Sequence, residues 1–278
     1  MTARRRLALA ALVSAVALVA SSCGSSDGDS ESPRAATPEE AAEAPDATPE
    51  AERDGAAGRG RYRMVVDEAP SRAGARPQRY AFRIERSPEQ TVRDFQVEHT
   101  KRMHLIVARR DLTGFQHLHP RMSGDGTWTT PVKIGEAGSY RVFADFKRGG
   151  RSHTLAGDLA VDGRLASRPM PPASTTAAAG DGYEVRLRGG SSTAGKETEL
   201  QFDVSRDGEK VAVQDYLGAK GHLVALREGD LAYLHVHPEA DAVRFATEFP
   251  SAGRYRLFLQ FKHEGKVRTA AFTRQVAG

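Results

Sequence analysis

The sequence predicts an all-β protein with two tandem β-sandwich domains, immunoglobulin-like or cupredoxin-like, that follow a signal peptide and a disordered stalk. Three observations lead to this prediction. One pattern of residues occurs twice, short runs alternate between apolar and polar residues, and turn-forming residues return about every 8–12 positions. No segment keeps a helical period of apolar residues over three turns. We therefore expect short antiparallel strands and no long helix.

The N-terminus, residues 1–22, has the order of an export signal. Arginines at positions 4–6 precede an apolar run over 7–20 that is too short to span a bilayer. Small residues then lead to Cys23, the one cysteine in the chain, in an order that resembles a bacterial lipobox, although Ala20 stands where leucine is usual. We expect lipidation at Cys23 and a lipid-anchored position on the extracytoplasmic face of the cell membrane. The alternative is an ordinary secretory signal in which Cys23 has no role.

Residues 23–60 are predicted to be a disordered stalk rich in alanine, proline and acidic residues. Positions 24–60 hold ten acidic residues, three arginines and almost no large apolar side chain. Such a segment buries too little apolar surface to offset the entropy lost on ordering. Its expected role is to hold the following domains away from the membrane.

The rest of the chain contains one unit twice. The matching segments are 104–109 with 222–227, 117–120 with 235–238, and 138–143 with 253–258. We predict one domain at 61–163 and a second at 182–278, joined by a linker at 164–181 that is rich in proline, serine, threonine and alanine.

Each repeat is expected to form seven or so short strands, as in small β-sandwiches. Alternation is visible at 80–84, 183–187 and 255–259. A Gly-x-Tyr sequence before a late strand, at Tyr140 and Tyr255, resembles the tyrosine corner of immunoglobulin-like domains. Both the immunoglobulin-like and the cupredoxin-like topology stay open at this point.

Six of the nine histidines follow the pattern His-x12-His-x-His-Pro, which occurs once in each repeat. They are His104, His117 and His119, and His222, His235 and His237. In a strand, residues two apart point to the same face, so the second and third histidine of each set project together. A hairpin turn centred on positions 229–230 sets 222 opposite 237 and 224 opposite 235, and the same register sets 104 opposite 119. Paired Cβ atoms lie about 5 Å apart, which lets three imidazoles share one ion.

Three imidazoles without a thiolate suit Cu(II), zinc or nickel, and the usual affinity order places copper ahead of zinc. A second interpretation is structural. Ile106, Phe115, Val224 and Tyr233 share the histidine face, so the rings could be core histidines that are hydrogen-bonded to carbonyl groups. Clustered imidazoles could also sense pH near their ordinary pKa of about 6.5.

His99 and Met103 lie close in sequence to His104, and Met122 follows His119, so a mixed His/Met copper site is a further alternative for the first repeat. The second repeat has Gly221 in place of Met103. The methionines are therefore better explained as packing residues.

Catalysis is not expected, and the protein is predicted not to be an enzyme. The chain has no Gly-x-Ser-x-Gly elbow, no phosphate-binding loop and no His-Glu-x-x-His motif. A single cysteine excludes an intramolecular disulfide and a multi-thiolate zinc site. The expected partners are a metal ion, the membrane through the lipid anchor, and a cell-envelope protein. Nucleic acid is not expected, because no stripe of basic and aromatic residues is present.

The repeat motifs Met-His-Leu-Ile-Val, Phe-Gln-His-Leu-His-Pro and Gly-x-Tyr-Arg-x-Phe resemble those of secreted actinobacterial lipoproteins with duplicated histidine-containing β-sandwiches. The segments concerned are 103–107, 115–120 and 138–143, with copies at 222–226, 233–238 and 253–258. The resemblance covers 61–278 and implies no particular activity. In outline the chain is also similar to exported β-sandwich proteins that handle copper, which is an analogy of fold.

The function expected from the sequence is that of an exported, membrane-anchored lipoprotein. It would bind a transition metal, copper ahead of zinc, at one three-histidine cluster per repeat, for sequestration or delivery. The alternative is an interaction or structural protein of the cell envelope, with structural histidines.

Overall fold

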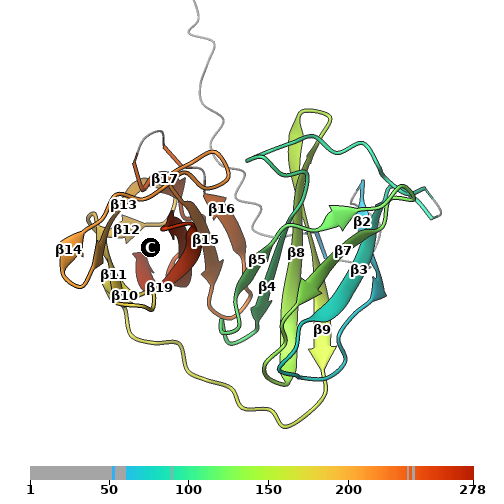
Figure 1. Ribbon diagram of the computed structural model, residues 1–278, viewed down its shortest axis with the longest axis horizontal. Helices are drawn as coiled ribbons and strands as arrows, with labels where there is room; N and C mark the ends of the chain where they lie inside the picture. Colours follow the sequence, from blue (N-terminus) through green and yellow to red (C-terminus); the bar gives the residue numbers. More distant parts are fainter. Residues whose placement is uncertain (1–51, 54–60, 89, 237, 240–241) are drawn as a thin grey trace, which may run out of the picture. The chain divides into compact units, whose positions relative to one another are not determined.

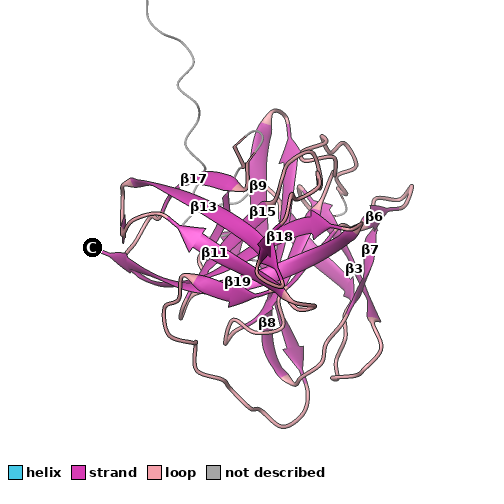
Figure 2. Cartoon of the chain, turned by 60° about the vertical axis from the view of Figure 1, so that its left-hand side comes forward, coloured by secondary structure: helices cyan, strands magenta, loops and turns pink. Residues whose placement is uncertain are grey.

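The computed structural model describes residues 52–53, 61–88, 90–236, 238–239 and 242–278. The predicted signal peptide, Cys23 and the stalk up to residue 51 lie outside the described residues, as do 54–60 and His237. Strands and loops make up the described part, and Figure 2 shows no helix in it. No helix that could cross a membrane is therefore found in this part of the chain. The all-β prediction is confirmed.

The first repeat folds as two sheets. Its strands are β1 (Glu52–Arg53), β2 (Arg63–Glu68), β3 (Gln78–Glu85), β4 (His104–Arg109), β5 (Gln116–Leu118), β6 (Arg121–Met122), β7 (Trp128–Val132), β8 (Gly138–Arg148) and β9 (Arg151–Val161). One sheet has the order β2-β3-β7-β6 and the other the order β1-β9-β8-β4-β5 (Figure 1). Strand β1 comes from the segment predicted as stalk and pairs in parallel with β9.

The second repeat also folds as two sheets. Its strands are β10 (Thr176–Ala178), β11 (Tyr183–Arg188), β12 (Ser192–Thr193), β13 (Glu197–Arg206), β14 (Glu209–Lys210), β15 (His222–Arg227), β16 (Tyr233–Val236), β17 (Arg244–Glu248), β18 (Gly253–His263) and β19 (Lys266–Ala277). One sheet has the order β10-β11-β13-β14, with β17 also paired to β13, and the other the order β12-β19-β18-β15-β16. Strand β10 lies within the range assigned to the linker and pairs with β11.

The strand order selects the immunoglobulin-like topology over the cupredoxin-like one. In each repeat, a strand from before the histidine hairpin pairs with a strand from after it. These pairs are β3 with β7 and β13 with β17. The opposite sheet places β8 between β9 and β4, and β18 between β19 and β15. This division corresponds to the A-B-E and C-F-G strands of an immunoglobulin domain.

Both predicted tyrosine corners are present. The Tyr140 hydroxyl donates a hydrogen bond of 2.7 Å to the carbonyl of Glu136, and the Tyr255 hydroxyl donates one of 2.9 Å to the carbonyl of Ser251. In each case the acceptor lies four residues upstream, at the corner that leads into the late strand. The two bonds tie matching corners in the two repeats.

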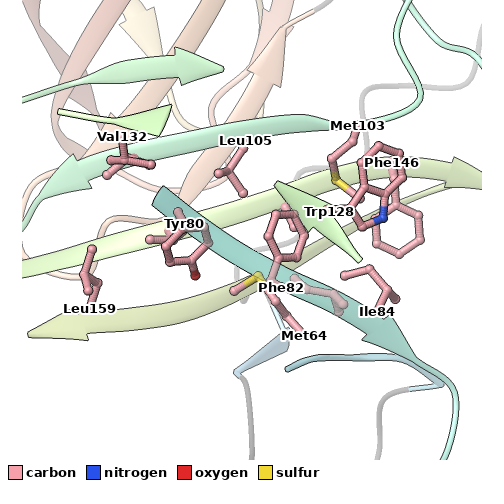
Figure 3. Packing of buried hydrophobic residues seen from close by; sticks show 14 of the residues in the cluster. Met64, Tyr80, Phe82, Ile84, Met103, Leu105, Trp128, Val132, Phe146 and Leu159 are labelled. Atoms are coloured by element: carbon pink, nitrogen blue, oxygen red, sulfur yellow. The ribbon is translucent and has the colours of Figure 1, made fainter. Parts of the chain in front are cut away.

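Each repeat has its own apolar core between its two sheets. Figure 3 shows the first core, where Phe82, Trp128 and Phe146 gather with Met103. Met103, the residue directly before β4, is only 1% exposed and belongs to this core, as do Leu105 and Val107 of β4. Met103 is therefore a packing residue, as the repeat comparison predicted.

A third apolar cluster is shared by the two repeats and joins the β4–β8 face of the first to the β15–β18 face of the second. Phe115 stacks on Phe258 with ring centroids 4.0 Å apart and planes inclined by 3°. Tyr233 stacks on Phe143 at 4.9 Å. Phe115 corresponds to Tyr233 and Phe143 to Phe258, so the two contacts are reciprocal, as in a two-fold interface. The face that carries the histidines is thus the face that meets the other repeat.

Candidate metal centre

The register of the hairpins is the one the sequence predicts. In the first repeat, Ile106 pairs with His117 and Leu105 with Leu118, which sets position 104 opposite position 119. In the second repeat, Val224 pairs with His235. A slip of one residue would have moved the leading histidine to the opposite face.

The three histidines of the first repeat meet at one point. Ring centroids are 5.2 Å apart for His104 and His117, 5.1 Å for His104 and His119, and 4.9 Å for His117 and His119. One nitrogen from each ring lies within 4.8 Å of the others. An ion about 2.0–2.1 Å from three imidazole nitrogens in tetrahedral arrangement would place the centroids about 5 Å apart. The spacing of the rings therefore fits a shared ion.

His104, at the start of β4, is 2% exposed, and each of its ring nitrogens has a polar neighbour. Its Nε2 lies 3.2 Å from the carbonyl oxygen of Glu98, and its Nδ1 lies 3.0 Å from Nε2 of His117. A carbonyl only accepts, so Nε2 carries the proton and Nδ1 of the neutral ring presents a lone pair toward His117. The second repeat has the matching hydrogen bond, in which His222 Nε2 donates to the carbonyl oxygen of Tyr216 at 2.9 Å.

His117, on β5, has one ring nitrogen on the cluster and the other on the second repeat. Its Nε2 faces His104, and its Nδ1 lies 2.8 Å from Oε1 of Gln260 on β18. With an amide oxygen as acceptor, Nδ1 carries the proton and Nε2 presents its lone pair. The lone pairs of His104 and His117 are then directed at the same point.

His119 is partly buried, and its Nε2 has no hydrogen-bond partner among the described residues. Burial, together with the positive charge that His104 and Lys101 can carry, lowers the pKa of His119 to about 3, and burial is the larger cause. The ring is therefore neutral near pH 7, which is the state in which imidazole acts as a metal ligand.

Two further histidines lie beside this triad. The ring of His222, 1% exposed, has its centroid 6.2 Å from that of His117. The ring of His99 lies 5.3 Å from His222 and 6.2 Å from His104. The leading histidine of the second repeat thus lies beside the first cluster, across the repeat interface. His235 lies on β16, but its side chain and the whole of His237 are outside the described part, so the second cluster is not described.

A buried carboxylate also lies next to the cluster. Asp145 is 4% exposed and is the backbone partner of His104 in the β4–β8 pair. It accepts a hydrogen bond of 3.0 Å from the hydroxyl of Tyr233, whose pKa burial raises well above 10, with a further increase from the charge of Asp145. Its charge can partly offset that of a cation at the triad.

Sequence reasoning missed Gln260 and Asp145. Each is the strand partner of a leading histidine, Asp145 of His104 and Gln260 of His222. Each is also a polar residue between two buried phenylalanines, at 143 and 146 or at 258 and 261. In the sequence, a polar residue between two phenylalanines, just after the Gly-x-Tyr motif, was the feature that could have identified them.

A cavity of about 690 Å³ lies elsewhere, and no histidine lines it. Its lining includes Arg72, Arg109, Glu136 and Arg168. Arg109 and Arg168 both pair with Glu136, so its carboxylate already balances one of these positive charges. The cavity offers less defined chemistry than the histidine cluster.

Solved structures similar to this chain have low TM-scores. A chimeric titin Z1Z2-Z1Z2 tandem functionalized with a fibronectin peptide is 12% identical, with 77% of this chain and 97% of that one covered and a TM-score of 0.20. Titin-A168169 is 11% identical, with coverages of 78% and 98% and a TM-score of 0.21. A putative membrane anchored protein from Corynebacterium diphtheriae is 8% identical, with coverages of 79% and 59% and a TM-score of 0.23. None of these likenesses indicates a function for this chain.

None of the curated proteins matches the chain. A family model, described as a domain of unknown function (DUF8832), matches residues 49–163 and again residues 176–278. Each match covers one of the two repeats, and together they include the histidine motifs and the tyrosine corners. The chain therefore belongs to the DUF8832 family.

Proposed function

We propose that this protein is an exported, membrane-anchored lipoprotein that binds a transition metal ion through His104, His117 and His119 and sequesters it or passes it on. Copper is expected ahead of zinc, because three neutral imidazoles without a thiolate suit Cu(II) and the affinity order favours it. Lipidation at Cys23 would keep the bound ion at the extracytoplasmic face of the membrane.

The observation that carries this proposal is the geometry of the three rings. Their centroids are 4.9–5.2 Å apart, and three nitrogens from different rings lie within 4.8 Å of one another. Burial keeps His119 neutral. Ring stacking in a core needs only contact between faces, whereas here the nitrogens converge.

The outer nitrogens support the same proposal. His104 Nε2 faces the carbonyl of Glu98, and His117 Nδ1 faces the amide of Gln260. Metal-bound histidines commonly donate their second N–H to such acceptors, which fixes the tautomer and the orientation of the ring.

The arrangement suits binding and transfer better than catalysis. An electron-transfer copper site of the blue type needs a cysteine ligand, and Cys23 is the one cysteine in the chain. No nucleophile with an adjacent base was recognised in the sequence. We therefore propose a binding protein and not an enzyme.

A structural role for the histidines is the second candidate, and one observation favours it. Nδ1 of His104 lies 3.0 Å from Nε2 of His117, a distance at which a proton between the two nitrogens holds the rings together without an ion. In that case the protein would contact a cell-envelope component, and the histidines would only join the two repeats.

Metal titration of the purified protein separates the two candidates. Cu(II), Cu(I) and Zn(II) are added separately, and stoichiometry and melting temperature are measured together. Binding with a rise in melting temperature is expected, since an ion that binds only the folded state stabilises it. No uptake at micromolar metal would exclude the metal-binding function.

The matched variant is the double substitution His117→Ala and His119→Ala. We expect it to lose the ion while it keeps the circular dichroism spectrum of the folded protein. His263→Ala serves as the control, because this histidine is bonded to Tyr183 and lies outside the cluster. Loss of the fold without any effect of metal on the wild type would support the structural role instead.

A further inference from the structure

One side chain of the second repeat reaches the metal centre proposed in the first. Gln260 is 8% exposed, and its Oε1 lies 2.8 Å from Nδ1 of His117, a contact between residues 143 positions apart. Gln260 is carried on β18, where it is the backbone partner of His222.

The position of Gln260 is set by the apolar interface. Phe258 lies two residues earlier on β18, so the two side chains point to the same face of the strand. Phe258 stacks on Phe115 of the first repeat at 4.0 Å, and Phe115 lies two residues before His117. The stacked rings therefore bring Gln260 and His117 together whenever the repeats are docked.

The contact decides which nitrogen of His117 is available. When the amide oxygen accepts, the proton is on Nδ1 and the lone pair of Nε2 is directed at the same point as Nδ1 of His104. In the other tautomer, the Nε2 hydrogen would occupy the space between the two rings, and the two nitrogens could not share an ion.

We infer that the second repeat completes the metal site of the first, with Gln260 as the positioning residue that holds His117 in its metal-binding tautomer. This inference rests on the metal-binding function proposed above. It also makes ion binding and docking of the repeats mutually stabilising, because each favours the state that the other needs. The unit that binds the ion is then the pair of repeats.

Two substitutions at one position test the inference. Gln260→Leu has a similar size and no acceptor, and loss of such an outer partner typically weakens metal binding about 10–100-fold. Gln260→Glu supplies a stronger acceptor, and we expect affinity equal to that of the wild type or higher. Affinities for Cu(II) and Zn(II) are measured on the purified full chain by competition with a chelator of known affinity.

A spectroscopic measurement accompanies the affinities. In the Zn(II)-loaded protein, the Nδ1 proton of His117 is expected as a slowly exchanging resonance coupled to its ring nitrogen. It should persist in Gln260→Glu and disappear in Gln260→Leu. A residue that only packs would not produce this difference. Gln275→Leu is the matched control, since Gln275 is exposed on β19.

The outcomes separate this inference from the proposed function. If the wild type binds no ion, the proposed function fails, and the inference fails with it. If the wild type binds and both Gln260 variants bind equally well, only the inference is overturned. Equal weakening in both variants, with matching losses in metal-free melting temperature, would also overturn it, because Gln260 would then act through packing alone.

Discussion

The two repeats share a fold but differ in the residues they present to each other. Both have a tyrosine corner and a leading histidine that donates to a carbonyl six residues upstream. Their main strands also pair in the same order, β9-β8-β4-β5 in the first repeat and β19-β18-β15-β16 in the second. The strand partner of the leading histidine is Asp145 in the first repeat and Gln260 in the second. The comparison shows that the copies agree in what each needs to fold and differ at the surface where they meet.

Substitutions in the two cores test whether the repeats unfold independently of each other. Phe146 and Phe261 occupy matching positions and are 1% and 0% exposed. Replacement of either by alanine should cost about 3–5 kcal/mol of unfolding free energy, through lost burial and the cavity left behind. Chemical denaturation of both variants, followed by tryptophan fluorescence, provides the measurement.

The chain has one tryptophan, Trp128, which lies in the first core. If the shared cluster between the repeats makes unfolding cooperative, Phe261→Ala will shift the fluorescence transition as far as Phe146→Ala does. A transition that responds to Phe146→Ala alone would show that the repeats unfold independently.

Acid should affect the first repeat more than the second. Glu85 is 2% exposed; burial raises its pKa, but hydrogen bonds from Arg83 and Arg63 outweigh this and hold it below the ordinary value. The unfolded chain therefore binds the proton more readily, and the stabilisation is present above about pH 4.5 and is lost as the pH falls through the folded pKa. We expect an effect of about 1 kcal/mol, because both arginines are partly exposed.

The measurement is the unfolding free energy of wild type and Glu85→Gln between pH 7 and pH 3. The variant should show a smaller loss on acidification. Asp203→Asn is the control, because Asp203 lies on β13, the counterpart of β3, and its side chain is 30% exposed. If Asp203→Asn flattens the pH dependence as much as Glu85→Gln, the contrast between the repeats is wrong.

A turn near the interface should give the smallest effect. Thr100 has a positive φ of 64°, and its counterpart in the second repeat is Gly218, with a φ of 82°. A left-handed conformation costs a non-glycine residue about 1–2 kcal/mol, while the greater freedom of glycine in the unfolded chain returns about 0.4–1 kcal/mol. Thr100→Gly should therefore stabilise the protein by about 0.8 kcal/mol, the difference between the midpoints of these two ranges, and Gly218→Thr should destabilise it. Thermal melts of the two variants check the opposite signs, and equal signs would contradict the strain argument.

Much of the fold follows from short-range patterns that the sequence displays directly. The β-hairpin register at His117 depends on the two-residue period of a strand and on a turn only a few residues away. The corners at Tyr140 and Tyr255 depend on an acceptor four residues upstream. In both cases the interacting residues lie close together in the chain, so few backbone arrangements can bring them into contact. The predicted register and the predicted tyrosine corners were therefore correct.

The sequence by itself determined the duplicated β-sandwich unit and the face on which the histidines lie. Only the tertiary structure decided that this face meets the other repeat, that His99 lies against His222, and that Gln260 contacts His117. Alternation shows that a strand face is apolar, but it does not show what covers that face. The covering surface here lies more than a hundred residues away, and its choice depends on the fit of two folded sheets, which no local spacing in the chain records.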